Sequence, residues 1–158
     1  MVLPIAVAAG FVLALLVPLV RRLFGRFAIV VFVALPALLA ALFVGLAPGV
    51  IDGEPLRWAT EWVPQLRLAF AFSLDGLSLL FCLLISGVGV AVILDAEHYL
   101  HGHPEIDRFH ALALAFMASM LGLVLADNLL LVLVFWGLTG VTSYLLIGFE
   151  HTIGTSRL

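Results

Sequence analysis

The chain has 158 residues, of which 65% are hydrophobic and only 11% are charged. A soluble domain has about 25% charged residues, so this balance excludes a water-soluble globule. The length allows one compact unit, with too few polar residues left for a separate catalytic domain. All seven basic residues are arginines against ten acidic residues, and the net charge of -3 leaves no basic surface for nucleic acid. The single cysteine, Cys82, lies in an apolar run and cannot form a disulfide within the chain.

Five uncharged apolar runs predict an all-α integral membrane protein with five transmembrane helices. Each run has about the 17–25 residues that a helix needs to cross the hydrocarbon of a bilayer. We expect one membrane domain over residues 1–158, and we interpret the first run as a retained helix because its arginines follow it rather than precede it. The runs comprise residues 1–20, 27–47, 76–94, 109–126 and 128–149.

The arginines predict how these helices are oriented in the cell membrane. Cytoplasmic loops carry an excess of positive residues, and an odd number of crossings places the two termini on opposite sides. The larger group of arginines would then be cytoplasmic, with the amino terminus outside and the carboxyl terminus inside. One side carries Arg21, Arg22, Arg26, Arg108 and Arg157, and the other carries Arg57 and Arg67.

The longest connection, residues 48–75, contains a stretch with the period of a β-strand. Apolar residues alternate with small or polar ones over residues 66–72, which is typical of a strand. Residues 56–63 offer a partner across Pro64 and Gln65, so a small external β-hairpin is predicted between the second and third helices. The alternative is that Trp58 and Trp62 are interfacial anchors on a short amphipathic turn.

Small and hydroxyl-bearing residues gather in the last two spans. In the fourth, Ala118, Gly122 and Ala126 recur at intervals of four, which lets helix backbones approach closely; the stripe serves either packing within the bundle or dimerisation. In the fifth, small and hydroxyl residues surround Trp136 near the middle of the span. Their hydroxyls either bond back to helix carbonyls or line a path for water or ions. The candidate lining residues are Gly137, Thr139, Thr142 and Ser143.

Residues 95–110 form a predicted cytoplasmic loop that holds four histidines and four carboxylates. Histidine at this density can bind zinc or another divalent metal, with His98, His101 and His103 as weak candidates. The spacing fits no strict ligand signature, so no metal site is expected. Histidine protonation near neutral pH offers a second interpretation, a pH-sensing loop.

Three ordered stretches resemble the antiporter-like subunits shared by Mrp-type Na+/H+ antiporters and respiratory NADH-quinone oxidoreductase. They are residues 73–81 (SLDGLSLLF), 116–128 (FMASMLGLVLADN) and 135–149 (FWGLTGVTSYLLIGF). The chain is most similar to the amino-terminal part of the large Mrp-type A subunit, with the chain 5 or L-type respiratory subunit as the near relative. The resemblance implies the external hairpin and a longer bundle that moves protons. The family motif positions are Asp75, Gly76, Asp127, Asn128, Trp136 and Gly137.

The resemblance also shows where this chain departs from its family. The family reads Phe-Trp-Glu-Leu-Thr-Ser at the fifth helix, whereas this chain has Gly137 in place of the glutamate that pairs with a lysine on a later helix. The lysine-bearing helices lie beyond residue 158, so we expect a subunit or fragment of a cation/proton antiporter that is inactive alone.

Its expected partners are the lipid bilayer, the other subunits of a membrane complex, and a chain that supplies the later helices. The alternatives are a proton-translocating membrane-arm subunit of an NADH-quinone oxidoreductase-like complex, or a non-conducting scaffold. No quinone, flavin or iron–sulfur ligand set is recognisable, so no cofactor and no enzyme chemistry are expected.

Overall fold

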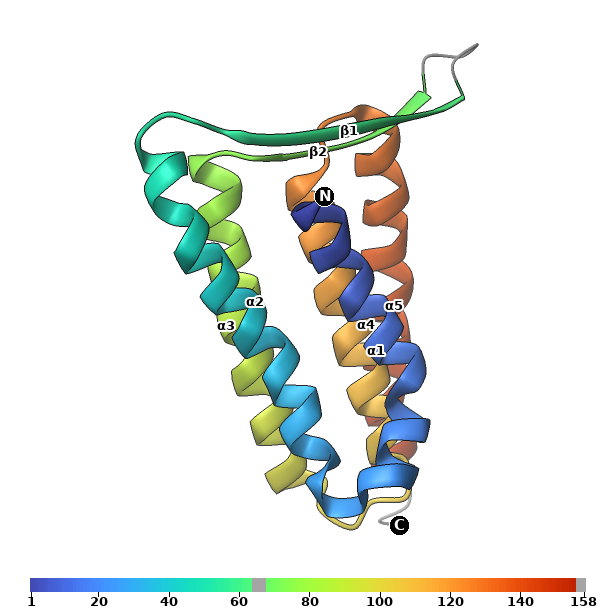
Figure 1. The fold of residues 1–158 in the computed structure, drawn as a ribbon. Helices are drawn as coiled ribbons and strands as arrows, with labels where there is room; N and C mark the ends of the chain where they lie inside the picture. Colours follow the sequence, from blue (N-terminus) through green and yellow to red (C-terminus); the bar gives the residue numbers. More distant parts are fainter. Residues whose placement is uncertain (64–67, 156–158) are drawn as a thin grey trace.

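The computed structural model describes residues 1–63 and 68–155, which form five α-helices, one 3-10 helix and one two-stranded antiparallel sheet (Figure 1). Four helical segments in this part of the chain are long and apolar enough to cross a membrane, since α1, η1 and α2 count as one segment. The predicted mostly helical membrane chain with a small sheet is therefore confirmed. The elements are α1 (Val2–Phe24), η1 (Gly25–Phe27), α2 (Ala28–Ile51), β1 (Leu56–Val63), β2 (Leu68–Leu74), α3 (Gly76–Tyr99), α4 (Ile106–Leu125) and α5 (Leu129–Thr155).

Every helix is longer than the apolar run from which it was predicted. Helix α3 continues to Tyr99 rather than residue 94, and α4 begins at Ile106 rather than residue 109. The predicted loop over residues 95–110 is therefore wrong, since only residues 100–105 lie between these helices. The run of apolar residues marks the part suited to hydrocarbon, but the i to i−4 backbone hydrogen bonds of a helix continue through charged residues.

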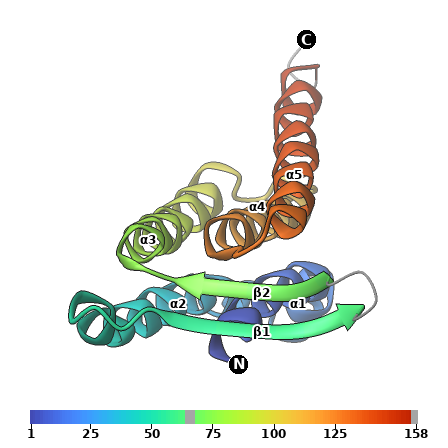
Figure 2. The same ribbon diagram turned by 90° about the horizontal axis from the view of Figure 1, so that it is seen from above.

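The chain reverses direction between α1 and α2 (Figure 1). Gly25 ends α1 with φ of 53°, a left-handed conformation that glycine adopts without steric cost. Helix α4 then packs against α1, α3 and α5, while α2 packs mainly against α3 (Figure 2). The core between them contains fully buried Phe32 and Phe43 of α2 and Leu114 and Leu121 of α4. Helix α4 is thus the central element of the bundle.

Small residues let α4 approach its neighbours closely. A Cβ placed on Gly10 of α1 would lie 2.7 Å from the Cβ of Ala118, and one placed on Gly122 would overlap the Phe135 ring of α5. Both α4 positions are buried. The predicted small-residue stripe at Ala118 and Gly122 therefore serves packing within the bundle.

The outer surface of the bundle is apolar. Leu15 of α1 is 80% exposed and Leu129 of α5 is 84% exposed, and many other large apolar side chains on all five helices are likewise exposed. Exposure of so much apolar surface to water is unfavourable, whereas its contact with lipid tails is not. This distribution fits helices that face a bilayer.

Strands β1 and β2 pair from Leu56 with Leu74 to Val63 with Leu68, with an irregularity between Glu61 and Val63. The predicted pairing of 56–63 with the alternating stretch is confirmed, and residues 56–63 are a strand rather than an amphipathic turn. The turn at Pro64 and Gln65 and the start of the predicted strand at residue 66 lie outside the described residues. On the sheet, Trp58 stacks on Phe72 with ring centroids 6.3 Å apart, and Trp62 lies against Phe70 at 5.3 Å.

Candidate functional site

The turn between α4 and α5 is fastened to the hairpin. The Asp127 backbone N–H donates to the Ala71 carbonyl at 2.9 Å. The Asn128 amide nitrogen donates to the Ala69 carbonyl at 2.6 Å, while its oxygen accepts from the Leu131 N–H at 2.8 Å. Asn128 therefore caps α5 and anchors β2 with one side chain, and these two family motif positions have a structural role at this end of the bundle.

Asp75 and Ser78 form a capping box at the start of α3. The Ser78 N–H donates to Asp75 Oδ1 at 2.8 Å, and the Asp75 N–H donates to Ser78 Oγ at 2.8 Å. These bonds satisfy two backbone donors that the helix itself leaves free. The hydrogen bonds from Ser78 also hold the pKa of the Asp75 carboxyl below its ordinary value. Asp75 thus fixes the point where β2 turns into the helix that begins at Gly76.

Two of the hydroxyls predicted to line an ion path bond back to their own helix. Thr139 Oγ1 donates to the Trp136 carbonyl at 2.7 Å, and Thr142 Oγ1 donates to the Leu138 carbonyl at 2.8 Å. Both threonines are buried, and Ser143 is half-buried. This geometry favours the interpretation that the α5 hydroxyls bond back to helix carbonyls over the interpretation that they line a path for water or ions.

Gly137 lies on a different face of α5 from the two threonines. It is exposed, and a Cβ added at Gly137 or at Gly140 would meet nothing within 4 Å beyond the adjoining residues and backbone of α5 itself. Trp136 and Tyr144 are also exposed, at 67% and 75%. The structure therefore does not bring the candidate lining residues together, and the position where the family has its glutamate opens away from this bundle.

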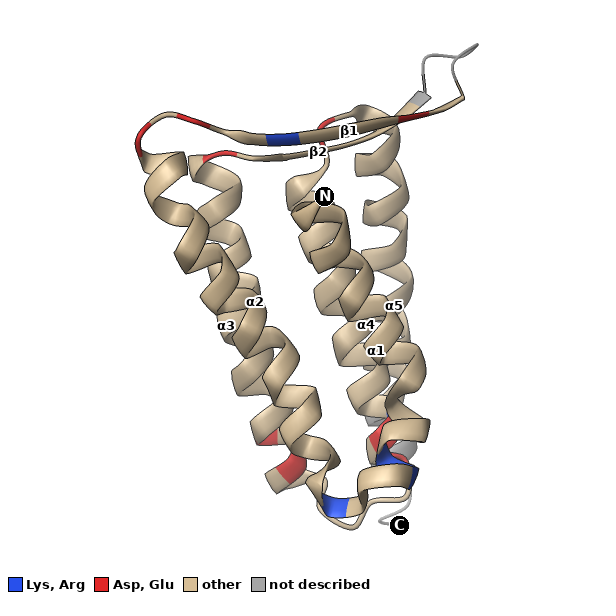
Figure 3. Cartoon of the chain, in the orientation of Figure 1, with Lys and Arg blue, Asp and Glu red and all other residues tan. Residues whose placement is uncertain are grey.

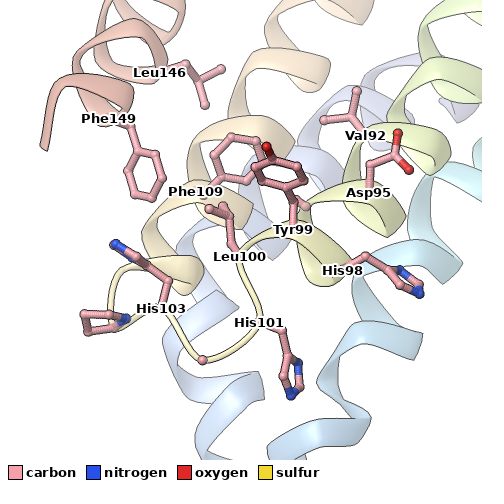
Figure 4. Close-up of a pocket in the computed structure, with 13 residues that line it drawn as sticks. Val92, Asp95, His98, Tyr99, Leu100, His101, His103, Phe109, Leu146 and Phe149 are labelled. Atoms are coloured by element: carbon pink, nitrogen blue, oxygen red, sulfur yellow. The ribbon is translucent and has the colours of Figure 1, made fainter. Parts of the chain in front are cut away.

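The three candidate metal-binding histidines surround a cavity of about 890 Å³ at the end of α3 (Figure 4). Their imidazole rings point in different directions, with His101 turned away from the other two (Figure 4). His98 Nδ1 lies 3.1 Å from the Leu94 carbonyl oxygen, and His103 Nδ1 accepts from the Glu105 N–H at 3.3 Å. Within the described part of the chain, no three His, Cys, Asp or Glu side chains are placed to hold a metal ion.

The same end of the bundle carries an ion cluster, which we define as Arg21, Glu97, Asp107 and His110. Arg21 of α1 donates from Nε to Asp107 Oδ1 at 2.7 Å, and from Nη1 and Nη2 to the two Glu97 carboxylate oxygens at 3.4 and 3.1 Å. The guanidinium therefore binds α3 and the first turn of α4 at once, in the bidentate geometry that arginine favours. Figure 3 shows the charged residues of α1 and α4 close together at this end.

His110 completes the ion cluster from α4 and is fully buried. Its Nδ1 lies 3.4 Å from Arg21 Nη2, and its Nε2 lies 3.7 Å from Glu97 Oε2. Nε2 makes no hydrogen bond within the described part of the chain, and the Ile93 backbone of α3 lies near the imidazole. The Phe32 ring of α2 covers the imidazole, with ring centroids 5.3 Å apart, and the Arg21 guanidinium carbon lies 5.5 Å from that ring centre. In the ion cluster, the partly exposed carboxylates of Glu97 and Asp107 thus lie next to the buried imidazole of His110.

Reasoning from the sequence missed the ion cluster. Arg21 served only to orient the helices, and Glu97, Asp107 and His110 were assigned to a solvated loop. One signal in the sequence could have indicated the cluster. All four residues lie within about one helical turn of the predicted cytoplasmic ends of the first, third and fourth spans. Their contacts depend on how α1 packs against α3 and α4, which the spacing along one chain does not specify.

Comparison with known proteins supports the resemblance drawn from the motifs. Residues 58–110 match the family described as NADH-ubiquinone oxidoreductase (complex I), chain 5 N-terminus. The A1 subunit of a Na(+)/H(+) antiporter of Staphylococcus haemolyticus (strain JCSC1435) is 38% identical over 148 residues, which are 93% of this chain and 18% of that protein. The A/B subunit of a probable K(+)/H(+) antiporter of Rhizobium meliloti (strain 1021) is 49% identical over 107 residues, 68% of this chain and 11% of that protein.

Two solved structures share the fold. A chain of the Mrp complex from Dietzia sp. DQ12-45-1b superposes with a TM-score of 0.77 and 33% identity, covering 91% of this chain and 15% of that one. A chain of the membrane-bound sulfane sulfur reductase, an archaeal respiratory membrane complex, gives a TM-score of 0.77 at 20% identity, covering 90% of this chain and 29% of that one. The second likeness concerns the fold alone. This chain spans less than a fifth of the length of the two curated relatives described above.

Proposed function

We propose that this chain, a relative of the Mrp-type antiporter A subunits, is part of a cation/proton antiporter subunit that acts within a multi-subunit membrane complex. The observation that carries the proposal is the 38% identity to the A1 subunit of a Na(+)/H(+) antiporter over 93% of the chain. The three sequence motifs lie at the start of α3, on α4 and on α5. Relatives named for both Na+ and K+ exchange support a monovalent cation as the substrate.

The open face of α5 supports an arrangement in which further helices complete the subunit. Gly137 and Gly140 leave room beside the helix axis, and Trp136 and Tyr144 offer large apolar contacts next to them. Close packing through small residues is how membrane helices associate without a hydrophobic driving force. Thr139 and Thr142 would contribute to an ion path, together with Ser143, only through the lone pairs of their own oxygens, because both threonine hydroxyl protons are already donated to helix carbonyls.

A substitution at Gly137 tests the transport role. Gly137→Glu supplies the carboxylate found in the family, at a position with free space, while Gly137→Gln adds the same bulk without charge. The chain is expressed in cells together with the other subunits of its complex, and inverted membrane vesicles are prepared from these cells. We expect Gly137→Glu to raise the rate at which added Na+ or K+ collapses a pH gradient across the vesicle membrane. Gly137→Gln should leave this rate unchanged. If both variants assemble normally without any change in rate, the transport role is contradicted and the non-conducting scaffold is favoured.

We further propose that α1 and α2 cross the membrane separately, giving five crossings with the hairpin outside. Their lengths of 23 and 24 residues correspond to about 35 Å each, enough for the hydrocarbon core, and the reversal at Gly25 lies between them. Arg21, Arg22, Arg26 and Arg108 at one end, against Arg57 on β1 at the other, support a cytoplasmic location for the end that carries the ion cluster.

Cysteine labelling tests this orientation. Thr60→Cys on β1 and His101→Cys between α3 and α4 place thiols at exposed positions at opposite ends of the bundle, and the native Cys82 is buried. A membrane-impermeant maleimide added to intact cells should label Thr60→Cys, and should label His101→Cys only after permeabilisation. Labelling of His101→Cys in intact cells would reverse the orientation.

A membrane-arm subunit of a respiratory complex is the second candidate, and the match of residues 58–110 to the chain 5 family favours it. The two candidates differ in what drives ion movement. Deletion of the chain should leave NADH-driven oxygen consumption in membrane vesicles unchanged if it serves an antiporter. Loss of that respiration, with cation-dependent exchange retained, would favour the respiratory assignment.

A further inference from the structure

We propose that the ion cluster is a proton-binding site, in which His110 takes up a proton in exchange for its hydrogen bond with Arg21. The site lies within the described helices and uses only residues of this chain. It goes beyond the proposed transport function and does not depend on it.

The contacts of His110 define which ring nitrogen receives the proton. A guanidinium has only donors, so Nδ1, at 3.4 Å from Arg21 Nη2, has to accept. In the neutral ring the proton is then on Nε2, the nitrogen that lies 3.7 Å from Glu97 Oε2 and makes no hydrogen bond within the described residues. The incoming proton binds Nδ1, because this is the ring nitrogen that has a lone pair in the neutral tautomer.

Burial of the ring and the Arg21 charge oppose a positive charge on His110, whereas the two carboxylates of the ion cluster favour it. The charged groups that face it are Arg21 on α1, Glu97 on α3 and Asp107 on α4, while α2 contributes only the apolar Phe32 ring. With a neutral imidazole these groups carry one net negative charge. Protonation of His110 brings the cluster to neutrality, and the imidazolium Nε2–H gains an ionic partner in Glu97.

The carboxylates of the ion cluster are open to solvent, whereas the imidazole is not. The Glu97 and Asp107 side chains are 20% and 35% exposed, whereas His110 is fully buried. In the uptake step a proton from water binds Nδ1, the hydrogen bond from Arg21 Nη2 to Nδ1 is lost, and no covalent bond other than N–H is formed. Arg21 then holds only the two carboxylates, and Glu97 is shared between the guanidinium and the imidazolium.

Nitrogen NMR of the full chain in lipid bilayers, with 15N-labelled histidine rings, tests this site. His110→Gln identifies the His110 signals among those of the five histidines. We expect a neutral ring with the proton on Nε2 at high pH and an imidazolium as the pH falls. Because an opposite charge within about 4–6 Å favours the charged form by one or more pKa units, Glu97→Gln should lower the proton affinity of His110 by about tenfold, and Arg21→Gln should raise it by about tenfold.

The matched control is His98→Gln at the same end of the bundle. His98 is exposed and contacts the Leu94 carbonyl on its own helix, so its replacement should leave the His110 titration unchanged. Arg21→Gln leaves two carboxylates without a partner and is the variant most at risk of misfolding, so Glu97→Gln alone decides the outcome. A neutral ring protonated at Nδ1, or a His110 titration that Glu97→Gln does not lower, overturns the proposal.

Discussion

Replacing Gly10 with alanine should separate α1 from α4. The added Cβ would lie 2.7 Å from the Ala118 Cβ and 3.4 Å from its Cα, against an optimal carbon–carbon separation of about 3.5–4.0 Å. Neither atom is the end of a flexible side chain, so the two backbones have to move apart. Overpacking of this kind costs about 1–3 kcal/mol.

Gly140→Ala is the matched control, because it makes the same exchange in a helix where the new methyl group meets nothing within 4 Å. Both variants gain about 0.8–1 kcal/mol of helix propensity, and the difference between them isolates the steric term. We therefore expect the free energy of unfolding of Gly10→Ala to be about 1–3 kcal/mol below that of Gly140→Ala.

The free energy of unfolding can be measured by titrating the chain from mild micelles into dodecyl sulfate and following circular dichroism. Ala118→Gly in the Gly10→Ala background removes the opposing methyl group and should recover the steric part of the loss, less about 0.8–1 kcal/mol of helix propensity. Equal stability of Gly10→Ala and Gly140→Ala, or the absence of recovery in the double variant, would refute the close contact between α1 and α4.

Two further predictions concern the end of the bundle that carries the hairpin. Asp75→Ala should lower the free energy of unfolding by about 1 kcal/mol through loss of the helix cap. The pKa of Asp75 is lowered in the folded state, so the carboxylate contributes its full stabilisation of the fold above its ordinary pKa of 3.8. This stabilisation is lost as the pH falls through the lowered pKa. An acid titration of the free energy of unfolding of Asp75→Asn should lack this loss. Asn128→Ala removes the bonds to Ala69 and Leu131 and should accelerate amide hydrogen exchange in β2. Asn128→Asp keeps the oxygen that caps α5, so it should retain slow amide exchange at the start of α5 but not in β2. Slow exchange in β2 of Asn128→Ala would show that the anchor lies elsewhere.

Features that depend on local pattern could be predicted from the sequence. The period-two alternation after Arg67 and the tryptophans before Pro64 predicted the two strands, because side chains on a half-buried strand alternate between faces. The spacing of Ala118 and Gly122 predicted close packing, and the contacts with Gly10 and Phe135 follow from it.

Features that depend on pairing across helices could not be predicted. The ends of α3 and α4 were wrong because the uncharged runs stop at Asp95 and Arg108, whereas the two helices extend beyond these residues. The added turns carry Glu97 and Asp107, whose charges are offset by Arg21 on another helix. His110 was treated as the edge of a span, yet Phe32 from another helix buries its ring. Gly137 was grouped with Thr139 by proximity in sequence, although two positions along a helix differ by about 200° in direction.

The bonds between β2 and the α4–α5 turn also constrain the order of synthesis. Ala71 and Asp127, which bond to each other, are 56 positions apart. At about 5–20 residues per second, the ribosome needs roughly 3–11 s to reach the second after making the first. During that interval the hairpin is an isolated two-stranded ribbon, which is marginally stable by itself, and its outer edge is open to other strands. A nascent chain arrested before Asp127 therefore exposes an unanchored hairpin, and rapid completion of α4 protects it from wrong partners.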